Sequence, residues 1–120
     1  MATIEKVHFT NSTNNRPVLV TATASPGTNV HIVTTNASRY DEVWLYAHNT
    51  NSSTNASLIV EFGSNTSADL IYAGIPARTG LYLIVPGIPL QGNSTPPMVR
   101  ATSNIANSVT LSGWVNRIIP

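Results

Sequence analysis

The chain contains no cysteine, which excludes disulfide bonds, thiolate chemistry and cysteine-ligated metal sites. It also carries little charge: only 9% of its 120 residues are Asp, Glu, Lys or Arg, against roughly 25% in ordinary soluble domains. The six Lys and Arg residues are scattered and form no basic cluster that could follow a phosphate backbone. We therefore expect no nucleic-acid partner.

Long apolar runs are missing as well. No stretch approaches the length that spans a membrane, and residues 1–10 lack the apolar run of a secretory signal. No segment combines a helical period with capping residues. These absences predict a chain without a membrane partner and without regular helices.

Short polar residues take the place of the charges. Ser, Thr and Asn supply 40 of the 120 positions, while hydrophobic residues make up 42%, enough for the core of one compact domain. Few charges would lose their water if such a surface docked against another protein. Simple compositional drift is the alternative explanation.

Apolar segments bounded by turn residues recur at intervals of roughly 10–15 residues. Alternation is clear at 56–62, where Leu58, Val60 and Phe62 share one face. The pattern predicts strands at 18–24, 29–34, 41–48, 56–62, 69–73, 81–85, 98–102 and 109–115. Frequent strands without helices between them form antiparallel sandwiches or barrels. We predict an all-β fold, a single antiparallel β-sandwich of the jelly-roll or Greek-key type with about eight strands, over residues 18–120.

Residues 1–17 form a separate unit in this interpretation, an extended N-terminal arm that ends in the polar run 10–17. Such an arm could add a strand to the domain's own sheet or reach a neighbouring subunit, and a frayed terminus is the alternative. Ile4, Val7, Phe9 and Arg16 are its candidate residues for contact with another protein. The polar loop 49–55 is expected to face solvent instead.

Aromatic residues are the most suggestive candidates for binding. Trp44 and Tyr46 project side by side from one strand face, and Trp114 belongs to the last strand. The other face of the 41–48 strand, with Val43 and Leu45, is also apolar. This favours a strand buried on both sides over a platform on which sugars stack.

Residues that could carry chemistry are few and badly spaced. His8, His31 and His48 form no local ligand pair, although His31 and His48 could meet across strands near Asp41 or Glu42. Those two acids are adjacent and point to opposite faces of their strand. A Ser/His/Asp arrangement depends on geometry and stays open, but no Gly-x-Ser-x-Gly elbow or phosphate-binding loop occurs. We predict a protein that is not an enzyme and holds no metal or cofactor.

Two groups of short motifs resemble small virion proteins of tailed bacteriophages, in the capsid decoration or cement class. The first group is DEVWLYA (41–47), LIVEFG (58–63), IPARTGL (75–81) and PG (86–87). The second is VRA (99–101), AN (106–107) and GWVNRI (113–118). The resemblance covers residues 41–118, and its family has no catalytic residues to transfer.

The resemblance implies a structural protein of the virion, made in the host cytoplasm and placed on the capsid surface. Its expected partners are the major capsid protein, whose subunits it would bridge to stabilise the shell, and itself, as a homotrimer. Arg78, Arg100 and Arg117 are candidates for ion pairs between subunits, with solvated surface charge as the alternative.

Two other functions remain open at this point: a receptor- or glycan-binding module of a phage tail or fibre, and a head–tail joining or tail component. The placement of Trp44, Tyr46 and Trp114 separates the first of them from decoration. Burial at a sheet or subunit interface favours decoration, whereas an exposed shelf beside Asn or Asp side chains favours the receptor or glycan module.

Overall fold

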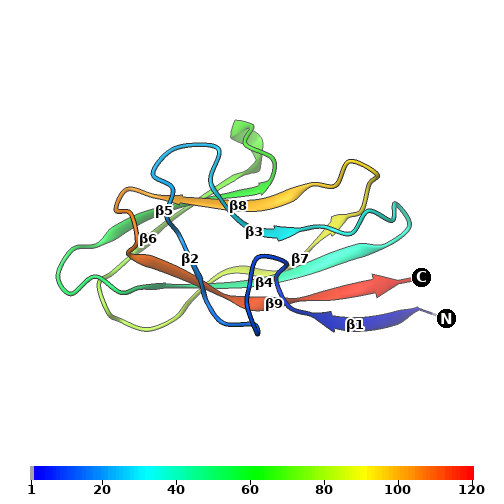
Figure 1. Cartoon of the computed structure of the whole chain (residues 1–120), viewed down its shortest axis with the longest axis horizontal. Coiled ribbons are helices and arrows are strands. Elements are labelled where there is room, and N and C mark those ends of the chain that lie inside the picture. Colours follow the sequence, from blue (N-terminus) through cyan, green and yellow to red (C-terminus); the bar gives the residue numbers. More distant parts are fainter. Residues whose placement is uncertain (1) are drawn as a thin grey trace.

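The computed structural model describes residues 2–120, which fold into two antiparallel sheets packed face to face (Figure 1). The strands are β1 (Thr3–Val7), β2 (Val18–Leu19), β3 (Thr28–Ile32), β4 (Tyr40–Asn49), β5 (Ala56–Gly63), β6 (Leu70–Ile75), β7 (Tyr82–Gln91), β8 (Met98–Ser103) and β9 (Val109–Ile119). A single 3-10 turn, η1 (Ser67–Asp69), precedes β6. The predicted β-sandwich is confirmed.

The strand order is that of a jelly roll. Sheet A has the order β1-β9-β4-β7, with β2 also on β9, and sheet B has the order β3-β8-β5-β6. The antiparallel pairs are nested along the chain: β5 with β6, β4 with β7, β3 with β8, and β1 and β2 with β9. A long hairpin folded over on itself gives this nesting, and β4–β9 and β5–β8 pairing joins it into two sheets.

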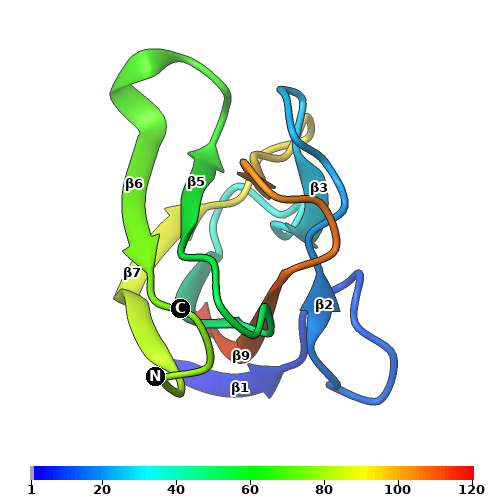
Figure 2. The ribbon, with the colours of Figure 1, turned by 90° about the vertical axis from the view of Figure 1, so that its left-hand side faces the viewer.

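Alternation along the strands builds the core between the sheets. Val43, Leu45 and Ala47 of β4 point inward and are fully buried, opposite Leu58 and Val60 of β5. Seen along its long axis, the molecule has β2 and β3 on one side and β6 and β7 on the other (Figure 2). Each sheet therefore has one face against the core and one face turned outward.

Three expected strands differ clearly in length from the prediction, and one of them, 109–115, simply continues to Ile119 as β9. The 18–24 segment pairs only as the two-residue β2, because the chain then leaves sheet A toward β3. The expected 81–85 strand continues through Pro86 and Pro89 to Gln91. The two prolines are tolerated because β7 is an edge strand, and its register against β4 shifts on either side of the Trp44–Pro86 pair.

The N-terminal segment lies along the domain's own sheet. β1 and β2 pair with successive parts of β9, and residues 8–17 leave the edge between them. In that excursion Phe9 enters the core, and the Asn11 backbone N–H donates to the Val30 carbonyl, 3.1 Å away. The excursion thus connects the edge of sheet A to β3 in sheet B.

The 49–55 loop faces solvent over most of its length, but Asn49 is fully buried at the end of β4. Its Nδ2 donates to the carbonyls of Thr54 and Ile75, both at 2.9 Å, and its Oδ1 accepts from the Ser108 hydroxyl at 2.8 Å. Such a fully satisfied amide is tolerated in the interior.

Candidate interaction surface

The outward face of sheet A carries the aromatic residues that the sequence singled out. On β4, Glu42, Trp44 and Tyr46 alternate with the buried core residues and so point away from the core. The register places Trp114 of β9 directly opposite Trp44. All three rings are half-buried on this outward face and lie outside the core.

The three rings stack on one another. The ring centroids of Trp44 and Trp114 are 5.7 Å apart with an interplanar angle of 13°, and those of Tyr46 and Trp114 are 6.2 Å apart at 29°. Aromatic pairs of this kind contribute about 0.5–1.5 kcal/mol beyond the area they bury. The stack therefore gives the outward face a fixed shape before any partner binds.

Polar neighbours hold the stack in place. Glu42 Oε1 accepts from Trp44 Nε1 at 2.8 Å and from Asn116 Nδ2 at 3.1 Å. These two hydrogen bonds lower the pKa of Glu42, the bond from Trp44 having the larger effect, so the carboxylate stays ionised. On the other side, Lys6 Nζ lies 5.2 Å from the centroid of the Trp114 ring, a cation–π distance.

Much of the area of the ring faces is already in contact with protein. A Cβ built on Gly87, which has a φ of +73°, would lie 2.6 Å from Trp44 Cζ2, so only a glycine fits beside this indole. Trp114 stacks against both other rings, and its buried Nε1 has no hydrogen-bond partner within residues 2–120. A sugar stacks on an open ring face, and here those faces already contact Gly87 and one another.

Apolar residues continue around the stack. The register puts Ile4 and Tyr40 in one rung with Ile118, and puts Leu83 beside Tyr46. Leu83 is 46% exposed and Ile4 is 66% exposed. We call this surface the aromatic face; it comprises Ile4, Lys6, Tyr40, Glu42, Trp44, Tyr46, Leu83, Pro86, Trp114, Asn116 and Ile118.

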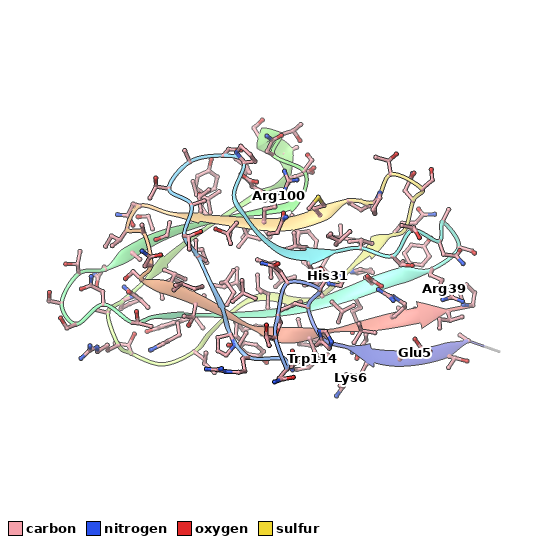
Figure 3. All side chains as sticks on the ribbon, in the orientation of Figure 1. Glu5, Lys6, His31, Arg39, Arg100 and Trp114 are labelled. Atoms are coloured by element: carbon pink, nitrogen blue, oxygen red, sulfur yellow. The ribbon has the colours of Figure 1, made fainter. Side chains whose placement is uncertain are left out.

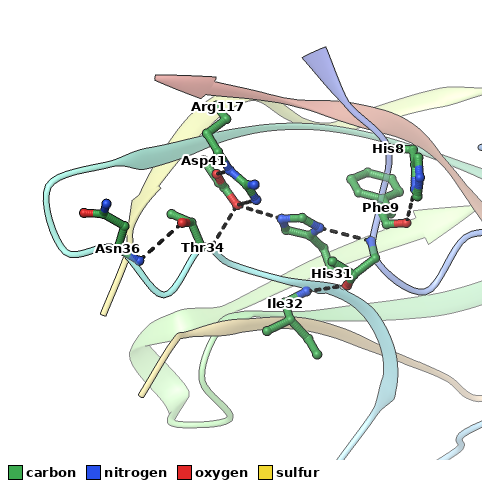
Figure 4. A network of polar contacts seen from close by, with 9 residues as sticks. His8, Phe9, His31, Ile32, Thr34, Asn36, Asp41 and Arg117 are labelled. Carbon is green, nitrogen blue, oxygen red and sulfur yellow. Dashed lines mark hydrogen bonds and ion pairs between the residues drawn. The ribbon is translucent and has the colours of Figure 1, made fainter. Parts of the chain in front are cut away.

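A buried polar cluster lies at the end of the sandwich where β4 begins (Figure 4). Asp41 and His31 are both fully buried. Asp41 Oδ2 accepts from His31 Nε2 at 2.8 Å and from the Thr34 N–H at 3.1 Å, while Arg117 Nε donates to Oδ1 at 2.8 Å. The Thr10 N–H donates to His31 Nδ1 at 3.2 Å, which fixes the neutral Nε2–H tautomer.

This tautomer decides what the cluster can do chemically. A His–Asp pair serves a nucleophile only if the second ring nitrogen can take its proton. In His31 that nitrogen is occupied by the backbone of Thr10, and the ring is fully buried. The cluster is therefore structural. His48 does not join it, because its Nδ1 lies 3.1 Å from the Gly80 carbonyl at the other end of β4.

We expect the free energy of unfolding to decrease in acid because the Asp41 carboxylate becomes protonated. Burial would raise the pKa of this carboxyl, but the hydrogen bonds from His31 and Arg117 and the charge of Arg117 outweigh burial and lower it from 3.8 to about 2. The unfolded chain therefore binds the proton first, and about 2 kcal/mol of stability should be lost as the pH falls from about 4 to 2. Urea unfolding of the wild type and Asp41→Asn at both pH values checks this. A stability gap between the two proteins that does not narrow in acid would contradict it.

The other candidate contact residues are dispersed. Phe9 lies in the core and Val7 packs against it, so neither offers an open surface, whereas Arg16 is exposed on the excursion between β1 and β2. Exposed Arg78 donates from Nε to the Thr50 carbonyl at 3.1 Å. Arg117, considered for an ion pair between subunits, forms its ion pair with Asp41 inside the chain.

Sequence reasoning missed Lys6, Glu42 and Asn116 as members of the surface. Glu42 and Asn116 each lie two residues from a tryptophan of the stack, so strand alternation could have placed both. Lys6 follows only from the β1–β9 register, which no local pattern encodes.

Within residues 2–120, no group of three or more His, Cys, Asp or Glu side chains is placed to hold a metal ion. No helix there has the length and apolar character needed to cross a membrane.

Comparison with known proteins assigns the chain to no family. No family model matches it, and neither a curated protein nor a solved structure matches it.

Proposed function

We propose that this chain is a structural virion protein, a capsid decoration protein that binds the outside of a phage head through its aromatic face. In this role it bridges neighbouring subunits of the major capsid protein and stabilises the shell. The observation that carries the proposal is the aromatic face itself. The outward side of an antiparallel sandwich sheet is commonly polar, whereas here it presents three stacked rings with the aliphatic residues Ile4, Leu83 and Ile118 on the same face.

The size of the face suits a protein partner. Four strands about 4.8 Å apart and the four rungs of the face about 6.8 Å apart span roughly 500 Å². Ordinary protein interfaces bury about 800 Å² on each partner, and contiguous exposed apolar patches of several hundred Å² mark interaction sites. The surface is thus large enough for one interface of less than ordinary area.

Its charge also limits the partner. Among residues 2–120, Lys6 and Glu42 are the only titratable side chains of the face besides its two tyrosines, and Glu42 is already hydrogen-bonded within the face. The charged groups of a highly charged partner would lose their water at this face without gaining an opposite charge in return. We therefore propose a nearly neutral, largely apolar patch on the shell protein. Repeated copies of that patch on a shell would strengthen weak individual contacts if the chain is a trimer.

A receptor- or glycan-binding module of a tail or fibre is the second candidate. The partly exposed rings beside Asn116 form the kind of shelf that such a module needs. The contacts of Gly87 and of the rings with one another weigh against sugar stacking at this position. A role as a head–tail joining or tail component would use the same face against a different virion protein.

Leu83→Glu is expected to weaken binding to purified heads of the encoding phage by about tenfold or more, because the interface would bury an unpaired charge. Leu83 is an exposed edge-strand residue of the aromatic face, so its replacement leaves the core intact. Co-sedimentation of the protein with the heads measures the affinity.

The matched control is Tyr72→Glu, which places the same charge at a 70% exposed position on β6 of sheet B. Its binding should equal that of the wild type. Equal binding by Leu83→Glu and the wild type would exclude the aromatic face as the docking surface. Absence of head binding by the wild type would refute the decoration role, and light scattering tests the proposed trimer separately.

A further inference from the structure

A small cavity opens on the outward side of sheet B. Its lining comes from the end of β5 and the turn after it, and from β8 with the residues before it: Glu61, Gly63, Ser64, Asn65, Pro96, Met98 and Arg100. Its volume is about 200 Å³. Arg100 lies in the opposite layer from Lys6 and Trp114 (Figure 3), so the cavity is separate from the aromatic face.

Glu61 is the unusual member of the lining. It points outward from β5, yet only 2% of it is exposed, because the turn at Gly27 covers it. This cover is tight: a Cβ built on Gly27 would lie 2.6 Å from the Ala101 carbonyl oxygen. Glu61 Oε1 accepts from the Gly27 N–H at 3.0 Å, and within residues 2–120 no side chain donates to Oε2. A buried carboxylate needs further hydrogen-bond donors, which a ligand in the cavity can supply.

Arg100 lies directly opposite Glu61 in the β5–β8 register but forms no ion pair with it. Its Nε instead donates to Asn29 Oδ1 at 3.0 Å, and its Nη2 lies 3.1 Å from Met98 Sδ. A guanidinium has five N–H donors, and these two contacts leave several for the cavity. The lining therefore includes a carboxylate with a free oxygen and, opposite it on the neighbouring strand, a guanidinium with further N–H groups to donate.

We propose that this cavity binds one sugar ring, a pyranose at the end of a glycan. An anionic ligand would be repelled by Glu61, and a cationic ligand would be repelled by Arg100. Hydroxyl groups both donate and accept, so neighbouring hydroxyls of one ring can donate to Glu61 and accept from Arg100. Ser64 and Asn65 add neutral polar groups, and Pro96 and Met98 add apolar atoms that the C–H face of the ring can contact.

The volume supports a single ring. Pockets for drug-sized ligands measure about 300–1,000 Å³, so this smaller cavity fits one ring better than an oligosaccharide. The rest of a glycan would extend into solvent. The site is independent of the docking function proposed above, since it lies on the other sheet.

The test is a titration of the ¹⁵N-labelled protein with glucose, galactose and N-acetylglucosamine, followed by amide chemical shifts. We expect at least one sugar to shift the amides of residues 63–65 and 100. Glu61→Gln keeps an oxygen for the Gly27 N–H but loses the charge, and it should lower the affinity for that sugar about tenfold or more. Arg100→Gln should lower the affinity comparably, whereas the control Arg78→Gln, on a distant loop, should leave the affinity unchanged.

Three results would overturn the proposal. In the first, none of the sugars shifts the cavity amides. In the second, a sugar shifts them equally in the wild type and in both cavity variants. In the third, free glycine shifts them while the sugars do not, which would mean that the site recognises a zwitterion. Leu83→Glu should bind the sugar normally, so that failure of head docking and failure of this site can be told apart.

Discussion

Asp41→Asn is expected to lower the free energy of unfolding by about 3–5 kcal/mol, the usual cost of removing one partner of a buried ion pair. The Asp41 carboxylate accepts from three groups: the Thr34 N–H, His31 and, through two bonds, Arg117. An amide of the same shape has only one acceptor oxygen. Its NH₂ group would face donors that the carboxylate now satisfies, and Arg117 would lose its counter-charge.

Glu42→Gln is the matched control for this variant. It makes the same chemical change one residue along β4, on the outward face, and its amide oxygen can still accept from Trp44. We expect it to cost under about 1 kcal/mol. Urea unfolding at neutral pH, monitored by tryptophan fluorescence, measures both. Equal stability of the two variants would show that the buried cluster contributes nothing beyond ordinary surface charge.

The local sequence pattern was enough to predict the sandwich, because the alternation and turn residues that define its strands lie within single strands and the turns beside them. The alternation of Leu58, Val60 and Phe62 marks the core face of β5, and all three pack inward. Turn residues correctly separated most of the strands. The predicted 81–85 strand stops at Pro86 because proline cannot donate to a ladder and so allows only a short or edge segment beyond it. In the structure β7 continues through both prolines as an edge strand, where no second neighbour requires a ladder donor.

Features that depend on register between distant strands escaped prediction. Asp41, His31 and Arg117 come from three separate segments, and only the folded sandwich shows that they form one cluster. Asn49 belongs to a segment whose composition is typical of a solvent-exposed loop. Its buried hydrogen-bond partner is Ser108, 59 positions further along the chain. Neither residue type nor local spacing distinguishes such residues from exposed ones.

The aromatic face was predicted in part. Strand alternation placed Trp44 and Tyr46 on one side, but pairing with Trp114 required the β4–β9 register. Sequence also favoured burial on both sides of β4, since both faces are apolar. The structure buries one side in the core and leaves the other to neighbouring side chains of the same sheet, so part of each ring remains open. That difference is what makes the face a candidate for docking.

Gly113→Ala is expected to destabilise the chain by about 3 kcal/mol or more, through backbone strain and overpacking together. Gly113 sits opposite Leu45 in β9 with a φ of +147°, in a region that favours glycine. A Cβ there would overlap the Trp44 carbonyl oxygen and lie 3.2 Å from Phe9 Cζ. Because the overlap is with backbone, the β4–β9 ladder would have to shift to relieve it.

Gly74→Ala is the matched control, since within residues 2–120 no heavy atom beyond Gly74 and its two chain neighbours lies within 4 Å of the position its Cβ would take on β6. It should change the free energy of unfolding by under about 0.5 kcal/mol. Because Gly113 precedes Trp114 in β9 and its Cβ would overlap the Trp44 carbonyl oxygen, its alanine variant should also alter tryptophan emission in the folded state, whereas Gly74→Ala should not. Wild-type stability and emission in Gly113→Ala would mean that the β4–β9 register does not hold the aromatic stack as described.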